Sequence, residues 1–425
     1  MMQVTAADLD LAALLRAGDR IIVGQAGAEP LTLTRALMRA APPPGCTVFV
    51  GMVGSDSFAA PPTSPNGGLG FESYGAIGKA AGLARLGRLS VLPMHYSALN
   101  RAFAEGTLRA DCILVQLAPG PGGRGYNLGF TRDYLLEAAR HARLVIAEIN
   151  PDAPCCHGGE WPGDIPIHIL VPADSAPLDL PAPAPGAVDL AIGGHVAGLI
   201  PDRAVLQLGV GALPQAVTAR LTGHRGLGLH SGVMFDGVLD LIEAGALTNA
   251  GKETDTGTSV AGLLVGTRRL RDFAHDNPSF RLAPPAHTHA HGVMAGLSRF
   301  CAVNSAVEVD LTGQVNAETA GGRYVGGVGG QVDFMRGANA SAGGRAIIAL
   351  PATAAGGRVS RIVPQAAIVT CARADVDAIV TEWGVAELRG CSLDERARRM
   401  VAIAAPEFRE DLSRHWHDHG RAAHE

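Results

Sequence analysis

The chain has 425 residues, a formal net charge of −5, 47% hydrophobic residues and 18% charged residues. This composition predicts a compact protein of two domains, and the negative charge argues against nucleic-acid binding. No apolar stretch reaches the roughly 18 residues that cross a bilayer, and residues 1–10 lack the basic and apolar regions of a signal peptide.

The first pattern along the chain is a strand, a glycine turn and a helix, predicted over residues 19–41. Residues 202–221 repeat this order, with a glycine turn and a proline near the first turn of the helix in both places. The recurrence favours an internal duplication.

Between these repeats, residues 172–186 contain five prolines, which exclude a helix or a central strand. We therefore predict an interdomain linker here, an N-terminal domain over residues 1–171 and a C-terminal domain over residues 187–425. Short apolar runs alternate with helical patterns and predict buried parallel strands in two layered α/β domains. These runs lie at residues 112–117, 144–149, 204–208, 346–350 and 378–381.

Two glycine turns are the strongest functional signal. Gly209, Val210 and Gly211 follow an apolar run and precede Leu213 in a helical pattern, and residues 326–334 (GGVGGQVDF) form a second glycine cluster. Glycine exposes main-chain N–H groups to a close ligand, so both turns suit an anion, a phosphate or a developing oxyanion. The first turn lacks the third glycine of a dinucleotide-binding motif, which argues against a nicotinamide cofactor.

Two histidine motifs allow several interpretations. His287, His289 and His291 would share one face of a strand and could hold a metal, but the flanking prolines favour a loop. His230-Ser231-Gly232 precedes a predicted helix that Ser231 could cap, and no G-x-S-x-G motif marks this serine as a nucleophile. The seven cysteines are scattered and odd in number, which predicts reduced thiols in a cytoplasmic protein.

The chain resembles the acetyl-CoA hydrolase/transferase family, which includes 4-hydroxybutyrate, butyryl and acetate CoA-transferases. The resemblance runs nearly from end to end. The stretches that carry it are residues 142–154 (ARLVIAEINPDAP), 206–217 (LQLGVGALPQAV), 236–249 (DGVLDLIEAGALTN), 304–318 (NSAVEVDLTGQVNAE), 326–336 (GGVGGQVDFMR), 356–364 (GGRVSRIVP) and 381–390 (TEWGVAELRG).

The resemblance implies two related open α/β/α domains with mostly parallel sheets and an active site between them. It also implies an acyl-CoA thioester as substrate, which a glutamate attacks to give an acyl-glutamyl anhydride and then a glutamyl-CoA thioester, before a carboxylate collects the CoA. Val210, Gly211, Gly329 and Gly330 would hold the oxyanion. Gly209, Leu213 and Gln331 would contact CoA or the substrate, and CoA would be a substrate rather than a tightly bound cofactor.

The sequence departs from the family at two places. The family pattern His-Thr/Ser-Glu becomes His230-Ser231-Gly232, so Gly232 occupies the position of the nucleophilic glutamate. The family pattern Tyr-Thr-Asn-Asp-Pro becomes residues 287–291, with His289 in place of the asparagine. The loop at residues 119–129 keeps Tyr126 but is more glycine-rich than in the family, which predicts a different choice of acyl group.

We expect the missing glutamate side chain to leave room for one or two waters. His289 could then act as general base in a thioesterase, or the protein could transfer CoA by a non-covalent route. The alternatives are a non-catalytic acyl-CoA binder and a carboxylate brought in from elsewhere, for which Glu318 and Glu72 are the candidates.

Arg361 and Arg358 are candidates for CoA phosphate contacts, with surface salt bridges as the equal alternative. The resemblance suggests that Glu382 positions CoA. The predicted partners are acyl-CoA and a carboxylate acceptor, with no nucleic acid, membrane or metal, and a homodimer is possible.

Overall fold

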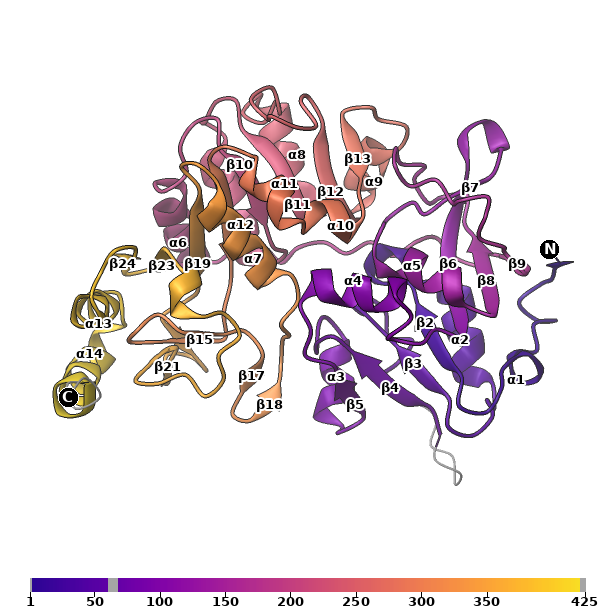
Figure 1. The fold of residues 1–425 in the computed structure, drawn as a ribbon, viewed down its shortest axis with the longest axis horizontal. Helices are drawn as coiled ribbons and strands as arrows, with labels where there is room; N and C mark the ends of the chain where they lie inside the picture. The colour runs from indigo at the N-terminus through magenta and orange to yellow at the C-terminus, as the bar shows by residue number, and fades with distance from the viewer. Residues whose placement is uncertain (1, 60–67, 421–425) are drawn as a thin grey trace. The chain divides into compact units, whose positions relative to one another are not determined.

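The computed structural model describes residues 2–59 and 68–420, which divide into two compact units (Figure 1). The first unit contains residues 1–181, 260–288 and 323–329, and the second contains residues 182–259, 289–322 and 330–425. The boundary at residue 181 falls inside the proline-rich segment, whereas residues 260–288 and 323–329 cluster with the first unit. The predicted domain limits treat residues 187–425 as one continuous body and stay a prediction.

The first unit is built on one large, almost entirely parallel sheet with the spatial order β1-β9-β8-β6-β2-β3-β4-β5. Only the short β7 is antiparallel, against β6. The strands are β1 (Met2–Gln3), β2 (Arg20–Val23), β3 (Thr47–Phe49), β4 (Gly70–Ser73), β5 (Leu89–Val91), β6 (Cys112–Pro119), β7 (Tyr126–Asn127), β8 (Leu144–Ile149) and β9 (Ile169–Pro172).

Helices cover both faces of this sheet because its strands are apolar on both sides. Ile21 on β2 lies in one apolar cluster and the next residue, Ile22, lies in the other, as expected when successive side chains alternate. The first cluster includes residues of α2 (Leu31–Arg39), and the second includes residues of α4 (Tyr96–Ala104) and α5 (Tyr134–His141). The result is the three-layer α/β/α arrangement that the sequence predicts.

Shorter elements complete the first unit. They are α1 (Leu11–Leu14), η1 (Ala26–Ala28), α3 (Ala80–Arg85), η2 (Pro121–Gly123), β12 (Ser259–Leu264), α9 (Arg268–Ala274), β13 (Phe280–Leu282), α10 (Pro285–Thr288) and β18 (Arg323–Tyr324). Except for Ser259, the first residue of β12, all of them fall within the ranges of this unit.

The second unit contains six neighbouring strands in the order β11-β10-β14-β19-β23-β24. All adjacent pairs are parallel except the last, in which β24 folds back on β23. The bounds are β10 (Val205–Leu208), β11 (Gly228–Met234), β14 (Phe300–Asn304), β19 (Arg345–Ala349), β23 (Ala378–Thr381) and β24 (Gly384–Glu387).

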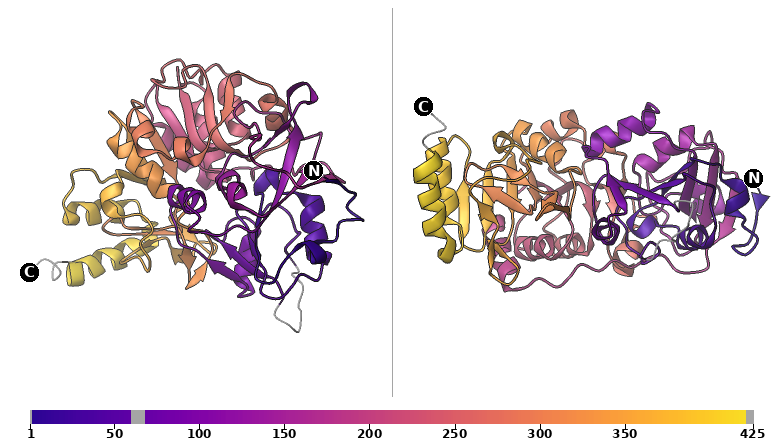
Figure 2. Two further views of the ribbon diagram at one scale, coloured as in Figure 1. Left: turned by 45° about the vertical axis from the view of Figure 1, so that its right-hand side comes forward. Right: turned by 90° about the horizontal axis from the view of Figure 1, so that it is seen from below.

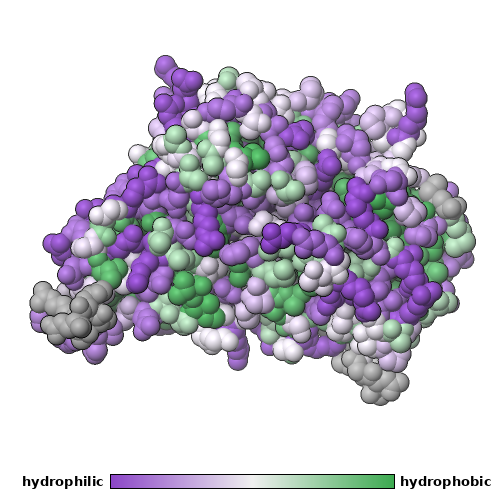
Figure 3. Space-filling model, in the orientation of Figure 1, coloured by the Kyte–Doolittle hydropathy of each residue, from purple (hydrophilic) through white to green (hydrophobic). Residues whose placement is uncertain are grey.

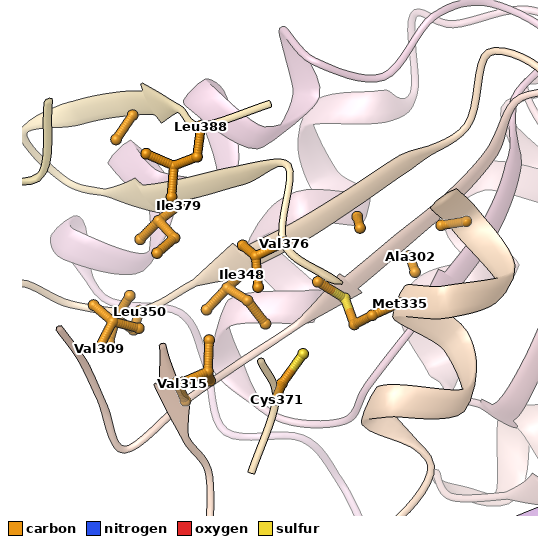
Figure 4. Close-up of a cluster of buried hydrophobic side chains, with 14 of the residues drawn as sticks. Ala302, Val309, Val315, Met335, Ile348, Leu350, Cys371, Val376, Ile379 and Leu388 are labelled. Carbon is orange, nitrogen blue, oxygen red and sulfur yellow. The ribbon is translucent and has the colours of Figure 1, made fainter. Parts of the chain in front are cut away.

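One face of this sheet packs on α12 (Gln331–Ala340). Ala302, Ile348 and Ile379 come from three adjacent strands and belong to the same apolar cluster as Met335 of the helix, as Figure 4 shows. The helices of this unit are α6 (Ala187–Ala197), α7 (Ala212–Leu221), α8 (Asp236–Glu243), α11 (His291–Ala295), α12, η3 (Arg373–Asp375), α13 (Leu393–Ala402), α14 (Pro406–His415) and the π-helical turn η4 (Trp416–Gly420). Helices α13 and α14 lie side by side at the yellow end of the chain in both Figures 1 and 2.

The same unit also contains short strands outside its main sheet. They are β15 (Glu308–Asp310), β16 (Val315–Asn316), β17 (Thr319–Ala320), β20 (Thr353–Ala354), β21 (Val359–Ser360) and β22 (Ile362–Val363). β15 pairs with both β16 and β22 and carries Val309 into the apolar cluster. The small sheet thereby fastens residues 305–316 to the main core.

Several sequence predictions are confirmed. The five apolar runs form β6, β8, β10, β19 and β23, and each pairs in parallel with a neighbour. Both repeats fold as strand, turn and helix, β2–α2 and β10–α7.

Polar and apolar residues intermingle on the face shown in Figure 3, as the mixed composition predicts. All seven cysteines are free thiols. Among the helices of the described residues, none has the length and apolarity needed to span a bilayer.

A buried carboxylate caps helix α2 in the first unit. Glu148, at the end of β8, is fully buried and accepts hydrogen bonds from the main-chain N–H groups of Thr32 (2.7 Å) and Leu33 (3.2 Å) through Oε2. Its other oxygen, Oε1, has no hydrogen-bond partner. Desolvation outweighs the two N–H donors and raises the pKa of Glu148 from 4.5 to about 7.

We expect stability to fall as pH rises from about 4.5 to about 7, because the folded state binds the Glu148 proton more tightly than the unfolded chain does. The loss should reach about 3 kcal/mol, at about 1.4 kcal/mol per pKa unit. Glu148→Gln should remove this slope in thermal unfolding measured from pH 4.5 to 8. The exposed Glu105→Gln serves as control, and an unchanged slope in Glu148→Gln would contradict this assignment.

Candidate functional site

The first glycine turn lies where the sheet of the second unit changes direction. The chain leaves β10 for β11 on one side and returns to β14 on the other, and ligands bind at such switch points beyond the carboxyl ends of parallel strands. Gly209, Val210 and Gly211 connect β10 to α7 here. Gly211 is the N-cap of α7 with φ +121° and ψ −173°, a conformation open only to glycine. Val210 is 37% exposed, and Leu213 is buried beneath the turn.

The second turn reaches the same edge of the sheet. Gly330 is the N-cap of α12, and the side chain of the first helical residue, Gln331, donates to the carbonyl of Ser305 at 3.0 Å. Ser305 directly follows β14, and Asn304 donates to Gln207 of β10 at 2.8 Å. The N-termini of α7 and α12 therefore stand beyond neighbouring strands, and each presents main-chain N–H groups and the positive end of a helix dipole.

His230, Ser231 and Gly232 lie inside strand β11 and do not precede the helix directly, so the predicted cap is wrong. Ser231 is fully buried, and its hydroxyl donates to the carbonyl of Leu208 at 3.1 Å. The N-cap of α8 is Phe235, with no side-chain cap. Strand β11 continues to Met234. Its first residues, Gly228 and Leu229, pair in parallel with Val205 and Leu206 of β10, and the same register sets Gly232 level with Gly209 of the first glycine turn.

Two side chains crowd the position next to Gly232 where water is expected. A Cβ atom added to Gly232 would lie 3.2 Å from His289 Cε1, 3.3 Å from His289 Nε2 and 3.3 Å from Phe334 Cε2. A Cβ atom on Gly330 would lie 2.5 Å from His289 Nε2. The imidazole therefore sits between Gly232 and Gly330, where the resemblance places the nucleophile and an oxyanion donor. The room for water expected at Gly232 stays a prediction, and these contacts narrow the space next to its Cα.

His289 is held by a tilted ring contact with Phe334 and by burial. Its ring is 4.4 Å from that of Phe334 between centroids, and only 7% of the residue is exposed. Desolvation, with a smaller contribution from His230, lowers the pKa of His289 from 6.5 to about 3. The ring is thus neutral across the physiological range and is a weak base, although it can still donate one hydrogen bond and accept one.

The loop predicted around these histidines is wrong. His287 belongs to the helical turn α10 and His291 begins α11, with His289 between them. Proline at the first position of a helical turn removes no needed N–H group, so Pro285 starts α10 rather than excluding it.

The side chains of Arg361 and Glu382 form hydrogen bonds with main-chain groups. The guanidinium of Arg361 donates to the carbonyls of Ala306 and Val307, the latter at 2.8 Å, and Glu382 accepts from the N–H of Ala352 at 2.8 Å. Burial lowers the pKa of Arg361, and the charge of Glu382 opposes this change. These bonds give both residues a structural role, and the CoA contacts proposed for them and for the exposed Arg358 stay predictions.

The substitute carboxylates have partners of their own. Glu318 is buried and accepts from the hydroxyl of Thr370 at 2.8 Å. Glu72 lies in the first unit, 2.9 Å from the guanidinium of Arg20. Among the described residues, the three atoms closest to a Cβ at Gly232 belong to His289 and Phe334 and not to a carboxylate.

Two further predicted residues lie in the first unit. Tyr126 is half-buried on β7, where it pairs with Pro119 of β6. Gly329 has a φ of +51°, and its carbonyl accepts a hydrogen bond from the N–H of Tyr96 at 2.9 Å.

Sequence reasoning did not nominate Phe334. It follows Gly330 by four residues, so both lie on one side of the first turn of α12, and its ring supports His289. Helical spacing from the glycine is the signal that could have found it.

The comparisons with known proteins identify the family of the chain. Residues 266–416 match the model of the acetyl-CoA hydrolase/transferase C-terminal domain. The chain is 42% identical over 330 residues to the 4-hydroxybutyrate coenzyme A transferase of Clostridium kluyveri, covering 77% of each chain. The chain belongs to the acetyl-CoA hydrolase/transferase family.

Solved structures extend this family assignment to the fold. RipA from Yersinia pestis is 30% identical with a TM-score of 0.89, covering 98% of this chain and 97% of that one. The 4-hydroxybutyrate CoA-transferase from Porphyromonas gingivalis is 29% identical with a TM-score of 0.78, covering 97% and 96%. The family's fold is thus retained, and the assignment of Gly232 to the position of the family's glutamate stays a prediction.

We expect the imidazole of His289 to remain neutral at pH 5, because burial lowers its pKa to about 3. At that pH an exposed histidine would be mostly protonated. The ¹⁵N chemical shifts of the labelled ring, assigned with the His289→Asn variant, should stay those of a neutral tautomer from pH 8 to 5. A midpoint near 6.5 would show that solvent reaches the ring.

Proposed function

We propose that this protein acts on the thioester of an acyl-CoA and passes CoA to a carboxylate acceptor. One observation carries the proposal: two helix N-termini with glycine caps, Gly211 and Gly330, stand beyond adjacent strands at a switch point. Main-chain N–H groups in such positions stabilise the negative charge that develops on a thioester carbonyl. The family's 4-hydroxybutyrate and butyryl CoA-transferases support the same substrate class.

The transfer we propose forms no bond between protein and substrate. The acceptor carboxylate attacks the thioester carbonyl, the C–S bond breaks, and CoA leaves as a thiolate beside a mixed anhydride. The thiolate then attacks the acceptor's carbonyl carbon in that anhydride, and the first acid leaves as a carboxylate. No step needs a protein carboxylate or a net proton transfer, which fits Gly232 and the weakly basic His289.

This geometry favours a carboxylate acceptor over water. Hydrolysis needs a base to take a proton from water, and a group with a pKa of about 3 does this poorly near neutral pH. A carboxylate is already anionic, and the neutral His289 can donate a hydrogen bond to it. His289 as the general base of a thioesterase is therefore the second candidate, and its product would be free thiol without an acceptor.

Steady-state kinetics test the proposal. Initial rates with butyryl-CoA and acetate, both varied, should give intersecting double-reciprocal lines, because both substrates must be bound together. Parallel lines would indicate a covalent intermediate. Free thiol released without acetate would support hydrolysis. Binding of CoA without turnover would support a non-catalytic binder. The crowding at Gly232 is the structural observation that favours this last alternative.

CoA would then be a co-substrate, and we propose no tightly bound cofactor. A homodimer and a cytoplasmic location also stay predictions; the second depends on the scattered free cysteines.

A further inference from the structure

The glycine turn at residues 326–329 packs against Gly75, another glycine of the first unit, and we call this contact the clasp. Gly75 and Gly327 form an antiparallel bridge, and the N–H of Ala76 donates to the carbonyl of Gly326 at 2.8 Å. A Cβ on Gly75 would lie 2.9 Å from both Gly326 O and Gly327 Cα, and a Cβ on Gly327 would lie 2.8 Å from Gly75 Cα. Backbone touches backbone here, so neither position has space for a side chain.

Ser73 fixes Gly75, one side of the clasp, by two hydrogen bonds. The hydroxyl of Ser73 donates to the carbonyl of Gly75 at 2.7 Å and accepts from its N–H at 3.2 Å. Ser73 is the last residue of β4 and is fully buried. The sheet of the first unit therefore fixes the main chain of Gly75 through Ser73.

A second contact fixes the end of the turn. His95 and Gly329 form a parallel bridge, and the N–H of Tyr96 donates to the carbonyl of Gly329 at 2.9 Å. The Tyr96 hydroxyl accepts from Gln25 Nε2 at 2.9 Å. Gln25 is buried and also bonds to Asp133, Tyr74 and the main chain of Met52. The partner of Gly329 is thus part of a buried polar network, which resists movement.

Fixing the carbonyl of Gly329 fixes the next amide. The described part of the chain contains no cis peptide bond, so the N–H of Gly330 points opposite to the carbonyl of Gly329 in the same planar unit. Because that carbonyl is tied to Tyr96, the Gly330 N–H must point the other way. This amide caps α12 and is one of the predicted oxyanion donors.

We propose that Gly75, Gly327 and Tyr96 are positioning residues that orient the Gly330 amide toward the thioester carbonyl. The inference rests on the proposed function, and it adds residues of the first unit that touch no reacting atom. A misplacement of about 1 Å at such a donor lowers turnover by about 10²-fold.

The test compares Gly75→Ala and Gly327→Ala with Gly163→Ala, a glycine of the same unit with nothing within 4 Å of an added Cβ. Hydrogen exchange in peptides covering residues 326–331 should rise in the first two variants and not in the third. Their kcat should fall about 10²-fold while KM for acyl-CoA changes little. The effects of the two substitutions should not add in the double variant, because each breaks the same contact.

Exchange at residues 326–331 equal to that of Gly163→Ala would overturn the clasp. Raised exchange with unchanged kcat would overturn its role in positioning the amide. If the Gly75→Ala variant does not fold, the same measurements on Gly327→Ala test the proposal, because Gly327 lies in the turn itself. If the wild-type protein turns over no acyl-CoA, the proposed function fails, and hydrogen exchange still decides whether the clasp holds the turn.

Discussion

Gly330→Ala should lower thioester turnover by about 10²- to 10³-fold, the loss typical of a displaced oxyanion donor. The added Cβ would lie 2.5 Å from His289 Nε2 and 3.1 Å from Phe334 Cε2, and these two buried rings contact each other at a tilt of 44°. Because the rings have little room to move, the turn must shift, and the amide that caps α12 shifts with it. Crowding of this kind costs about 1–3 kcal/mol of stability.

The control for this variant is Gly194→Ala in helix α6, where an added Cβ meets nothing within 4 Å. It should keep full activity. Shortening the crowded ring in Gly330→Ala/His289→Ala should restore part of the stability lost by Gly330→Ala, as judged by thermal unfolding. A fully active Gly330→Ala protein would rule out this amide as a donor.

The Gly232→Glu/His289→Asn double variant should acquire a covalent glutamyl-CoA thioester that neither single variant forms. The two substitutions restore the residues that the family resemblance places at these positions. In Gly232→Glu alone, the new side chain starts 3.2 Å from His289 Cε1 and is forced into the ring, so this variant should lose about 1–3 kcal/mol of stability. Replacing the ring with the smaller amide makes room for a nucleophilic carboxylate.

The adduct is measured by intact-protein mass after incubation with acyl-CoA, and borohydride should reduce it to an alcohol. Double-reciprocal plots should change from intersecting to parallel lines. The matched control is Gly232→Gln/His289→Asn, which has the same shape without a carboxylate. An adduct on Gly232→Glu alone would mean that His289 does not block the position, and its absence in the double variant would mean that residue 232 is not where attack occurs.

Local patterns predicted most of the fold. The apolar runs that became β6, β8, β10, β19 and β23 are short and flanked by turn residues, so burial on both faces leaves one stable arrangement. The glycine turn at residues 209–211 was identified because a strand directly precedes a helix there. The second turn, at residues 326–334, was found from glycine density alone.

The failures arose where distant contacts decide local structure. The sequence predicts that Ser231 caps a helix, but β11 continues past Ser231 to Met234 and the helix begins only at Asp236. The sequence predicts open space at Gly232, but His289, distant in sequence, lies 3.2 Å from the position of an added Cβ there. The low basicity of that ring follows from burial, which a sequence does not display.

The path of the chain limits how this protein can be divided. It passes from one compact unit to the other after residues 181, 259, 288, 322 and 329, which makes five passages. A cut in the proline-rich segment would therefore leave residues 260–288 and 323–329, which belong to the first unit, on the C-terminal fragment. A chimaera of two relatives joined at this segment would combine residues of both parents in the core of the first unit. We therefore expect the N-terminal and C-terminal halves of the chain to diverge together in evolution and not to be exchanged as separate modules.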